Sequence, residues 1–127
     1  MRNRIRRMAS SCALLTAALI STTVQAHDVV GFTGFSAERG EHLFKTNFST
    51  GKPDTPSCTT CHTTDPRKTG QTRAGKDIEP MAASVNSKRY SDQAKTEKWF
   101  GRNCNNVLGR ECTATEKGDF ITFMLAQ

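Results

Sequence analysis

The segment "CTTCH" at Cys58–His62 determines how this chain is interpreted. Two cysteines stand three positions apart, and a histidine directly follows the second one. Thiols at this spacing can reach both vinyl groups on one edge of a porphyrin, and the adjacent imidazole then projects under the iron. The motif therefore predicts one covalently attached haem c, with Cys58 and Cys61 as attachment sites and His62 as the proximal ligand.

Two other kinds of site also use closely spaced cysteines. A zinc site needs a second compact pair of ligands, but Cys104 and Cys112 are eight positions apart and have no histidine near them. A thioredoxin-like redox pair needs a βαβ context, whereas the flanking segments 51–57 and 63–70 have the composition of loops. Haem attachment is therefore the interpretation that the motif and its surroundings favour.

The first 26 residues have the features of an export signal. Four arginines lie within the first seven positions, and the apolar run at 8–20 is too short to cross a membrane. Val24 and Ala26 occupy the positions that a signal peptidase reads. Cleavage after Ala26 would shorten the 127-residue chain by 26 residues to 101, leaving one periplasmic domain, 27–127. An uncleaved membrane anchor is the alternative.

The charge balance changes when the signal is removed. The whole chain has 18 Lys and Arg against 12 Asp and Glu, a net charge of +6. Loss of the four signal arginines leaves 14 basic against 12 acidic residues, or +2, and the haem propionates would bring the total close to zero. The basic precursor is therefore no sign of nucleic-acid binding, and no nucleic-acid partner is expected.

Capping signals and apolar periodicity predict a small helical domain around the motif. The expected helices with their capping residues are 36–48 with Ser36, about 91–103 with Ser91 or Asp92, and 113–127 with the capping box of Thr113 and Glu116. The segment 63–80 is expected to be a polar loop. This order of elements predicts an all-α fold that wraps around a haem.

With these segments in view, the chain resembles the class I cytochromes c, and among them the SHP-type cytochromes, which are high-spin and bind oxygen. The segments similar to class I members are "ERGEHLF" (38–44), "CTTCH" and "IEP" (78–80), together with the closing helix. Those similar to the SHP type are "GKPDTPSCTTCH" (51–62), "GQTRAGK" (70–76), "EKWFGRNCNNVLGREC" (97–112) and "EKGDF" (116–120). The resemblance covers about residues 37–127 and implies the small class I cytochrome c fold.

The resemblance also implies roles for particular residues. It implies that Asn103 is the sixth ligand of the iron, and that the Pro80 carbonyl accepts a hydrogen bond from His62 Nδ1. It implies a disulfide between Cys104 and Cys112. As partners it implies a dihaem cytochrome c and a membrane cytochrome b, with a diatomic ligand at the haem; we expect the protein to be a monomer.

The residues themselves leave the sixth ligand open. Asn103 lies four positions after Trp99, so that both share one helical face and Trp99 is a candidate for the haem pocket. The alternative for Asn103 is an ordinary residue at a helix C-terminus. Met81 is the alternative ligand, standing where an SHP-type chain commonly has leucine. Met124 is expected in the core, and His42 is expected to face solvent.

The choice of ligand decides the predicted function. An asparagine oxygen suits ferric better than ferrous iron, so that it would detach on reduction and let a diatomic molecule bind. We therefore expect an exported monohaem cytochrome that accepts electrons and binds a diatomic ligand. The alternatives are a low-spin electron carrier with Met81 bound and a small reductase of oxygen, peroxide or a nitrogen oxide. No catalytic acid–base pair is evident, so electron transfer with ligand binding is favoured over enzymatic turnover.

Overall fold

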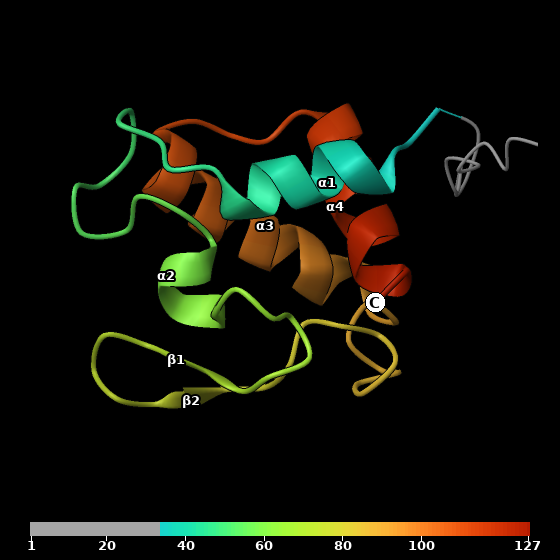
Figure 1. Cartoon of the computed structure of the whole chain (residues 1–127). Helices are drawn as coiled ribbons and strands as arrows, with labels where there is room; N and C mark the ends of the chain where they lie inside the picture. Colours follow the sequence, from blue (N-terminus) through green and yellow to red (C-terminus); the bar gives the residue numbers. More distant parts are fainter. Residues whose placement is uncertain (1–33) are drawn as a thin grey trace, which may run out of the picture.

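The computed structural model describes residues 34–127, and their longer helices are α1, α3 and α4 (Figure 1). Helix α1 spans Ala37–Lys45 and begins after Ser36, whose hydroxyl accepts a hydrogen bond of 3.3 Å from the Arg39 N–H. The predicted cap at Ser36 is thus confirmed. The helix ends before the predicted position 48, because Thr46 has extended backbone with ψ 137°.

Helix α3 spans Gln93–Leu108 and is five residues longer than the predicted 91–103 at its C-terminal end. Asp92 is its N-cap, and its side chain accepts a hydrogen bond of 2.9 Å from the Lys95 N–H. The helix continues past position 103 because Val107 and Leu108 extend its buried face. It ends at Gly109, whose φ of 71° is a left-handed conformation that glycine adopts without steric cost.

Helix α4 spans Ala114–Leu125 and begins with the predicted capping box, in which Thr113 and Glu116 exchange hydrogen bonds. It packs against α1, and Phe44 of α1 lies 5.8 Å from the Phe123 ring. The two helices approach closely because Gly40 has no side chain: a Cβ there would clash with the backbone of Asp119. This pair of helices and the C-terminal half of α3 form the hydrophobic core.

The segment 63–80 carries a short β-ribbon that the sequence did not predict. Strand β1, Gly70–Gln71, pairs antiparallel with β2, Asp77–Ile78, in the register Gly70 to Ile78. The short helix α2, Thr59–His62, precedes this ribbon and contacts it. The rest of the described chain is helix and loop, so the predicted helical class is confirmed with a two-stranded sheet added.

The predicted signal segment 1–26 and the cleavage point after Ala26 lie outside the described residues. Within residues 34–127, no helix combines the length and the apolar composition that crossing a membrane requires.

Candidate haem site

A cavity of about 640 Å³ lies between α2, the β-ribbon, α3 and the loop that joins the ribbon to α3. Cys61 and His62 line it from α2, and Asn103 lines it from α3. Several sequence-predicted site residues therefore meet at one cavity. Its volume is within the range of pockets that bury a small organic ligand or cofactor.

Helix α2 presents the attachment motif through one short turn. His62 N–H donates to the Cys58 carbonyl at 3.1 Å, so Cys58 is the N-cap of this turn and Cys61 lies within it. Both thiols are free and half-buried, and burial raises the pKa of Cys58 to about 11. Gly70 of β1 lies against this turn, where a Cβ would clash with the Cys61 carbonyl. The β-ribbon thus packs against the helical turn that carries the attachment motif.

His62 is suited to bind a metal. Burial, together with the positive charge of Arg89, lowers the pKa of His62 to about 4. The imidazole is therefore uncharged at neutral pH, which is the form that binds iron. Its Nδ1 is buried without a hydrogen-bond partner among residues 34–127. The imidazole of His62 and the free thiol of Cys61 line this cavity, and the second free thiol, that of Cys58, lies at the N-cap of the same short helix. This arrangement fits a covalently attached haem.

The predicted hydrogen bond from His62 Nδ1 to the Pro80 carbonyl is not formed in the structure. This carbonyl instead accepts a hydrogen bond of 3.3 Å from Asn86 Nδ2. A turn brings the amide there, because Asn86 N–H donates to the Ala82 carbonyl at 3.1 Å. The described partner of the Pro80 carbonyl is thus Asn86, and its bond to His62 stays a prediction for the haem-bound protein.

Helix α3 contributes the face on which Trp99 and Asn103 were expected together. Both residues line the cavity. Asn103 is half-buried, and no hydrogen bond within residues 34–127 engages its carboxamide. The alternative that Asn103 ends a helix is wrong, because α3 continues to Leu108. Trp99 is 45% exposed, and the Arg102 guanidinium carbon lies 5.6 Å from the centroid of its ring.

Met81 also lines the cavity, but it is held by several contacts. Its sulfur accepts a hydrogen bond of 2.8 Å from Arg89 Nη2, and its carbonyl accepts one of 2.9 Å from Tyr90 Oη. Its N–H donates to the Pro66 carbonyl at 2.8 Å. The side chain is only 7% exposed. Met124 is fully buried in the core and His42 is exposed, as the sequence predicted for both.

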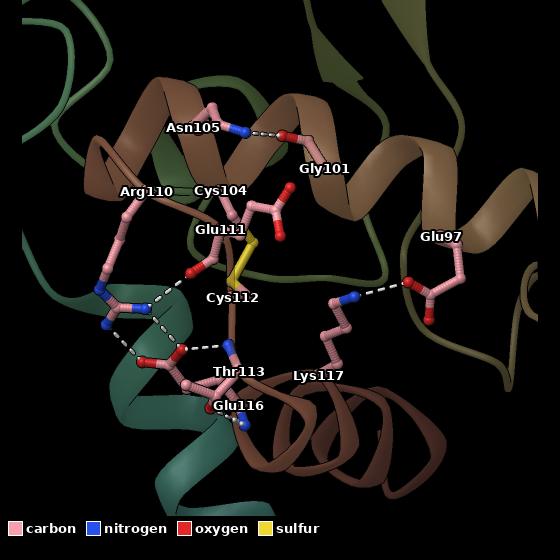
Figure 2. Close-up of a disulfide and its surroundings, with 10 residues drawn as sticks. All are labelled: Glu97, Gly101, Cys104, Asn105, Arg110, Glu111, Cys112, Thr113, Glu116 and Lys117. Atoms are coloured by element: carbon pink, nitrogen blue, oxygen red, sulfur yellow. Dashed lines mark hydrogen bonds and ion pairs between the residues drawn. A yellow bond between two sulfur atoms is a disulfide. The ribbon is translucent and has the colours of Figure 1, made fainter.

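A disulfide joins Cys104 of α3 to Cys112, with Cα atoms 5.6 Å apart (Figure 2). Beside it, Arg110 forms an ion pair with Glu116 at 2.7 Å. The hydrogen bond from Arg110 lowers the pKa of Glu116 to about 2. Figure 2 also shows Asn105 Nδ2 donating to the Gly101 carbonyl at 2.6 Å. The disulfide ties down the part of α3 that carries Asn103, which directly precedes Cys104.

Sequence reasoning missed several residues that line the cavity, among them Asn86, Arg89 and Tyr90. They lie in the loop between β2 and α3, which has no periodic pattern and no motif. The only signal for these residues in the sequence was their nearness to Met81, which lies in the same loop. Burial raises the pKa of Tyr90, so that its phenol stays neutral and donates to the Met81 carbonyl.

Comparison with known proteins agrees with this site. Residues 30–124 match the family described as Domain of unknown function (DUF1924). Cytochrome c-type protein SHP from Cereibacter sphaeroides is 47% identical over 122 residues, which cover 92% of this chain and 95% of that protein.

Solved structures of cytochromes c also share the fold. The structure of oxidised SHP, an oxygen-binding cytochrome c, has a TM-score of 0.72 at 54% identity and covers 73% of this chain and 83% of that one. The solution structure of cytochrome c'' from Methylophilus methylotrophus, which concerns haem-ligand detachment, has a TM-score of 0.60 at 36% identity. It covers 72% of this chain and 75% of that one. The free thiols of Cys58 and Cys61, the neutral imidazole of His62 and this similarity agree: the chain belongs to the SHP-type cytochromes c, which hold a covalently bound haem c.

Proposed function

We propose that the protein is an exported electron-accepting cytochrome that binds a diatomic molecule at a position Asn103 vacates. The observation that carries this proposal is the placement of Asn103 at the same cavity as His62, with its carboxamide unbonded among the described residues. The similar protein SHP is an oxygen-binding cytochrome c, which supports oxygen as one such molecule.

Each residue of the site has one task in this proposal. Haem c supplies an iron that changes between ferric and ferrous states and accepts a diatomic ligand on an open face. The free thiols of Cys58 and Cys61 would attach the porphyrin, and the neutral ring of His62 would be the proximal ligand. The oxygen of the Asn103 carboxamide is a hard, weak donor that prefers ferric iron. Asn103 would therefore hold the ferric iron and would be released from the ferrous iron.

The position and contacts of Met81 argue against its use as the sixth ligand. Its sulfur already accepts a hydrogen bond from the Arg89 guanidinium, and its backbone is bonded on both sides of the residue. To bind the iron, the Met81 thioether would have to give up its hydrogen bond with the charged Arg89 guanidinium. Met81 is buried, so no solvent would replace that bond. Asn103 would break no such bond among the described residues.

A dihaem cytochrome c remains the proposed electron donor, in line with the resemblance to SHP-type chains.

Absorption spectra of the ferric and ferrous protein test the ligand assignment. Asn103→Ala should leave the haem attached, since Cys58 and Cys61 do that, but should change the ferric axial-ligand bands. Carbon monoxide should still bind the ferrous variant, because Asn103 has already detached there. The matched control is Asn105→Ala, two positions along the same helix, which removes an exposed amide that bonds Gly101.

The Met81→Ala variant completes this test. Under the proposal its axial-ligand bands equal those of the wild type, while the protein becomes less stable. Altered bands in Met81→Ala, together with wild-type bands in Asn103→Ala, would show instead that the protein is a methionine-ligated electron carrier.

A further inference from the structure

Trp99 of α3 lines the cavity and also reaches solvent. Within residues 34–127 the exposed large apolar residues are Val85, Leu125 and Trp99, and of these only Trp99 lines the cavity. Trp99 is 45% exposed. A side chain that belongs both to the wall of a cavity and to the surface lies at the mouth of that cavity.

Along α3, the approach to Asn103 is open in one direction only. Beyond Asn103 the helix is buried at Cys104, Val107 and Leu108. In the other direction the next turn of the same helical face carries Trp99. A molecule that enters the cavity along α3 therefore passes the indole before it reaches Asn103.

Two aromatic rings close the side of the cavity that faces α4. Phe100 and Phe120 both line the cavity, and they pack edge to face with ring centroids 5.5 Å apart. Phe120 is only 7% exposed, so its ring has little room to move. The exposed indole of Trp99 can change its rotamer more readily than this buried wall.

Arg102 restrains the indole without fixing it. Its guanidinium carbon lies 5.6 Å from the centroid of the Trp99 ring. No ion pair within residues 34–127 involves Arg102, so the indole is the described contact of its charge. A cation over an aromatic ring is a weak attraction at an exposed site. The indole can therefore swing aside and return.

We propose that Trp99 selects by size the molecules that reach the position of Asn103. A diatomic molecule passes the indole, whereas a larger ligand has to displace it. Arg102 is the positioning residue that keeps the indole at the mouth of the cavity. This inference rests on the proposed function, in which Asn103 vacates a binding position, and adds which molecules are admitted there.

Association rate constants of carbon monoxide and of n-butyl isocyanide, measured on the purified ferrous haem protein, test this selection. Trp99→Ala should raise the constant for the isocyanide several-fold and that for carbon monoxide less, because only the larger ligand has to displace the indole. Trp99→Phe should lie between the wild type and Trp99→Ala. Lys98→Ala is the matched control, since Lys98 is the adjacent exposed residue of α3 and does not line the cavity. Both of its rate constants should equal those of the wild type.

The ratio of the two rate constants separates size selection from a general loosening of the protein, which would raise both alike. Arg102→Gln should change this ratio in the same direction as Trp99→Ala but by less, and a wild-type ratio would overturn the role of Arg102. A wild-type ratio in both Trp99 variants would overturn the selection by Trp99, as would an equal change in Lys98→Ala. Trp99→Phe decides the matter if Trp99→Ala does not fold. A ferrous wild-type protein that binds neither ligand would overturn the proposed function together with this inference, whereas unselective binding would overturn the inference alone.

Discussion

Asp119 is a buried carboxylate on α4 that connects both ends of the described chain. Its oxygens accept hydrogen bonds from the Ser36 N–H at 2.7 Å and from Arg39 Nε at 2.7 Å. Burial alone would raise the pKa of Asp119, but these hydrogen bonds hold it below its ordinary value of 3.8. The charged form is therefore the one that stabilises the fold.

The depressed pKa of Asp119 predicts a loss of stability in acid. The contribution of this carboxylate is complete above its unfolded pKa and disappears as pH falls through the lower folded value. Asp119→Asn should lower the free energy of unfolding at pH 7 by about 1.5–3 kcal/mol, and should flatten its dependence on pH below about 4. Urea unfolding at several pH values measures both. Asp77→Asn is an exposed control, which should change neither the free energy of unfolding at pH 7 nor its dependence on pH. Equal unfolding curves for the Asp119 and Asp77 variants would contradict the stabilising role of Asp119.

At the scale of the elements, the close contact of α1 with α4 depends on one missing side chain. A Cβ at Gly40 would overlap the Asp119 backbone, whereas a Cβ at Gly101 of α3 would meet nothing within 4 Å. The two glycines stand in helix interiors, where alanine is intrinsically better. The same substitution should therefore have opposite effects at the two positions.

Thermal unfolding of the two alanine variants tests this contrast. Gly40→Ala should destabilise the protein by about 1–3 kcal/mol, because the helices must separate to admit the methyl group. Gly101→Ala should stabilise it by about 0.5–1 kcal/mol through helix propensity. A harmless Gly40→Ala would mean that α1 and α4 can shift apart at little cost.

The bond between Cys104 and Cys112 closes a short loop between α3 and α4. Replacing both cysteines by serine should cost about 2–3 kcal/mol in the chain-entropy model, since the unfolded chain regains the freedom of that loop. The measurement is chemical denaturation of the double variant against the wild type. Thr113→Ala, which removes the cap of α4 but keeps the disulfide, is the comparison, with an expected loss of about 1 kcal/mol. If the double variant is no less stable than Thr113→Ala, the ion pair between Arg110 and Glu116 already holds the loop.

Local signals predicted the elements better than their ends and their contacts. Ser36, Thr113 and Glu116 were found from the sequence because a cap bonds residues only three positions away. The end of α3 was misplaced because Asn103, Asn105 and Asn106 have a composition typical of helix ends, while burial of Val107 and Leu108 carries the helix on. The β-ribbon was missed because two paired residues leave no periodic pattern.

In the candidate site, too, residues whose role depends on local spacing were predicted, and contacts between distant segments were not. Cys58, Cys61 and His62 were found because their chemistry depends on spacing along the chain. Asn103 and Trp99 were placed on one face because helical geometry decides it. The partner of the Pro80 carbonyl and the position of Arg89 depend on how an irregular loop folds back. Such contacts are made in three dimensions and have no signature in a single sequence.

For the whole molecule, the remaining prediction concerns its mature start. Cleavage after Ala26 removes all four signal arginines and leaves His27 as the first residue. N-terminal sequencing of the exported protein should read from His27, and the intact mass should equal 101 residues plus one haem. A start at Met1 in a membrane fraction would show an uncleaved anchor. A cytoplasmic chain without haem would contradict export.

The bonds between Ser36, Arg39 and Asp119 have a consequence for the order of folding. They join residues 80 and 83 positions apart, so α1 can pack against its partner only when α4, near the C-terminal end of the described residues, is available. A chain that leaves a ribosome or a translocation channel from its N-terminus must therefore present α1 with its apolar side uncovered until α4 emerges. During that interval the "CTTCH" segment lies in a chain that cannot yet close its core, and we expect its two thiols to be open to haem attachment then.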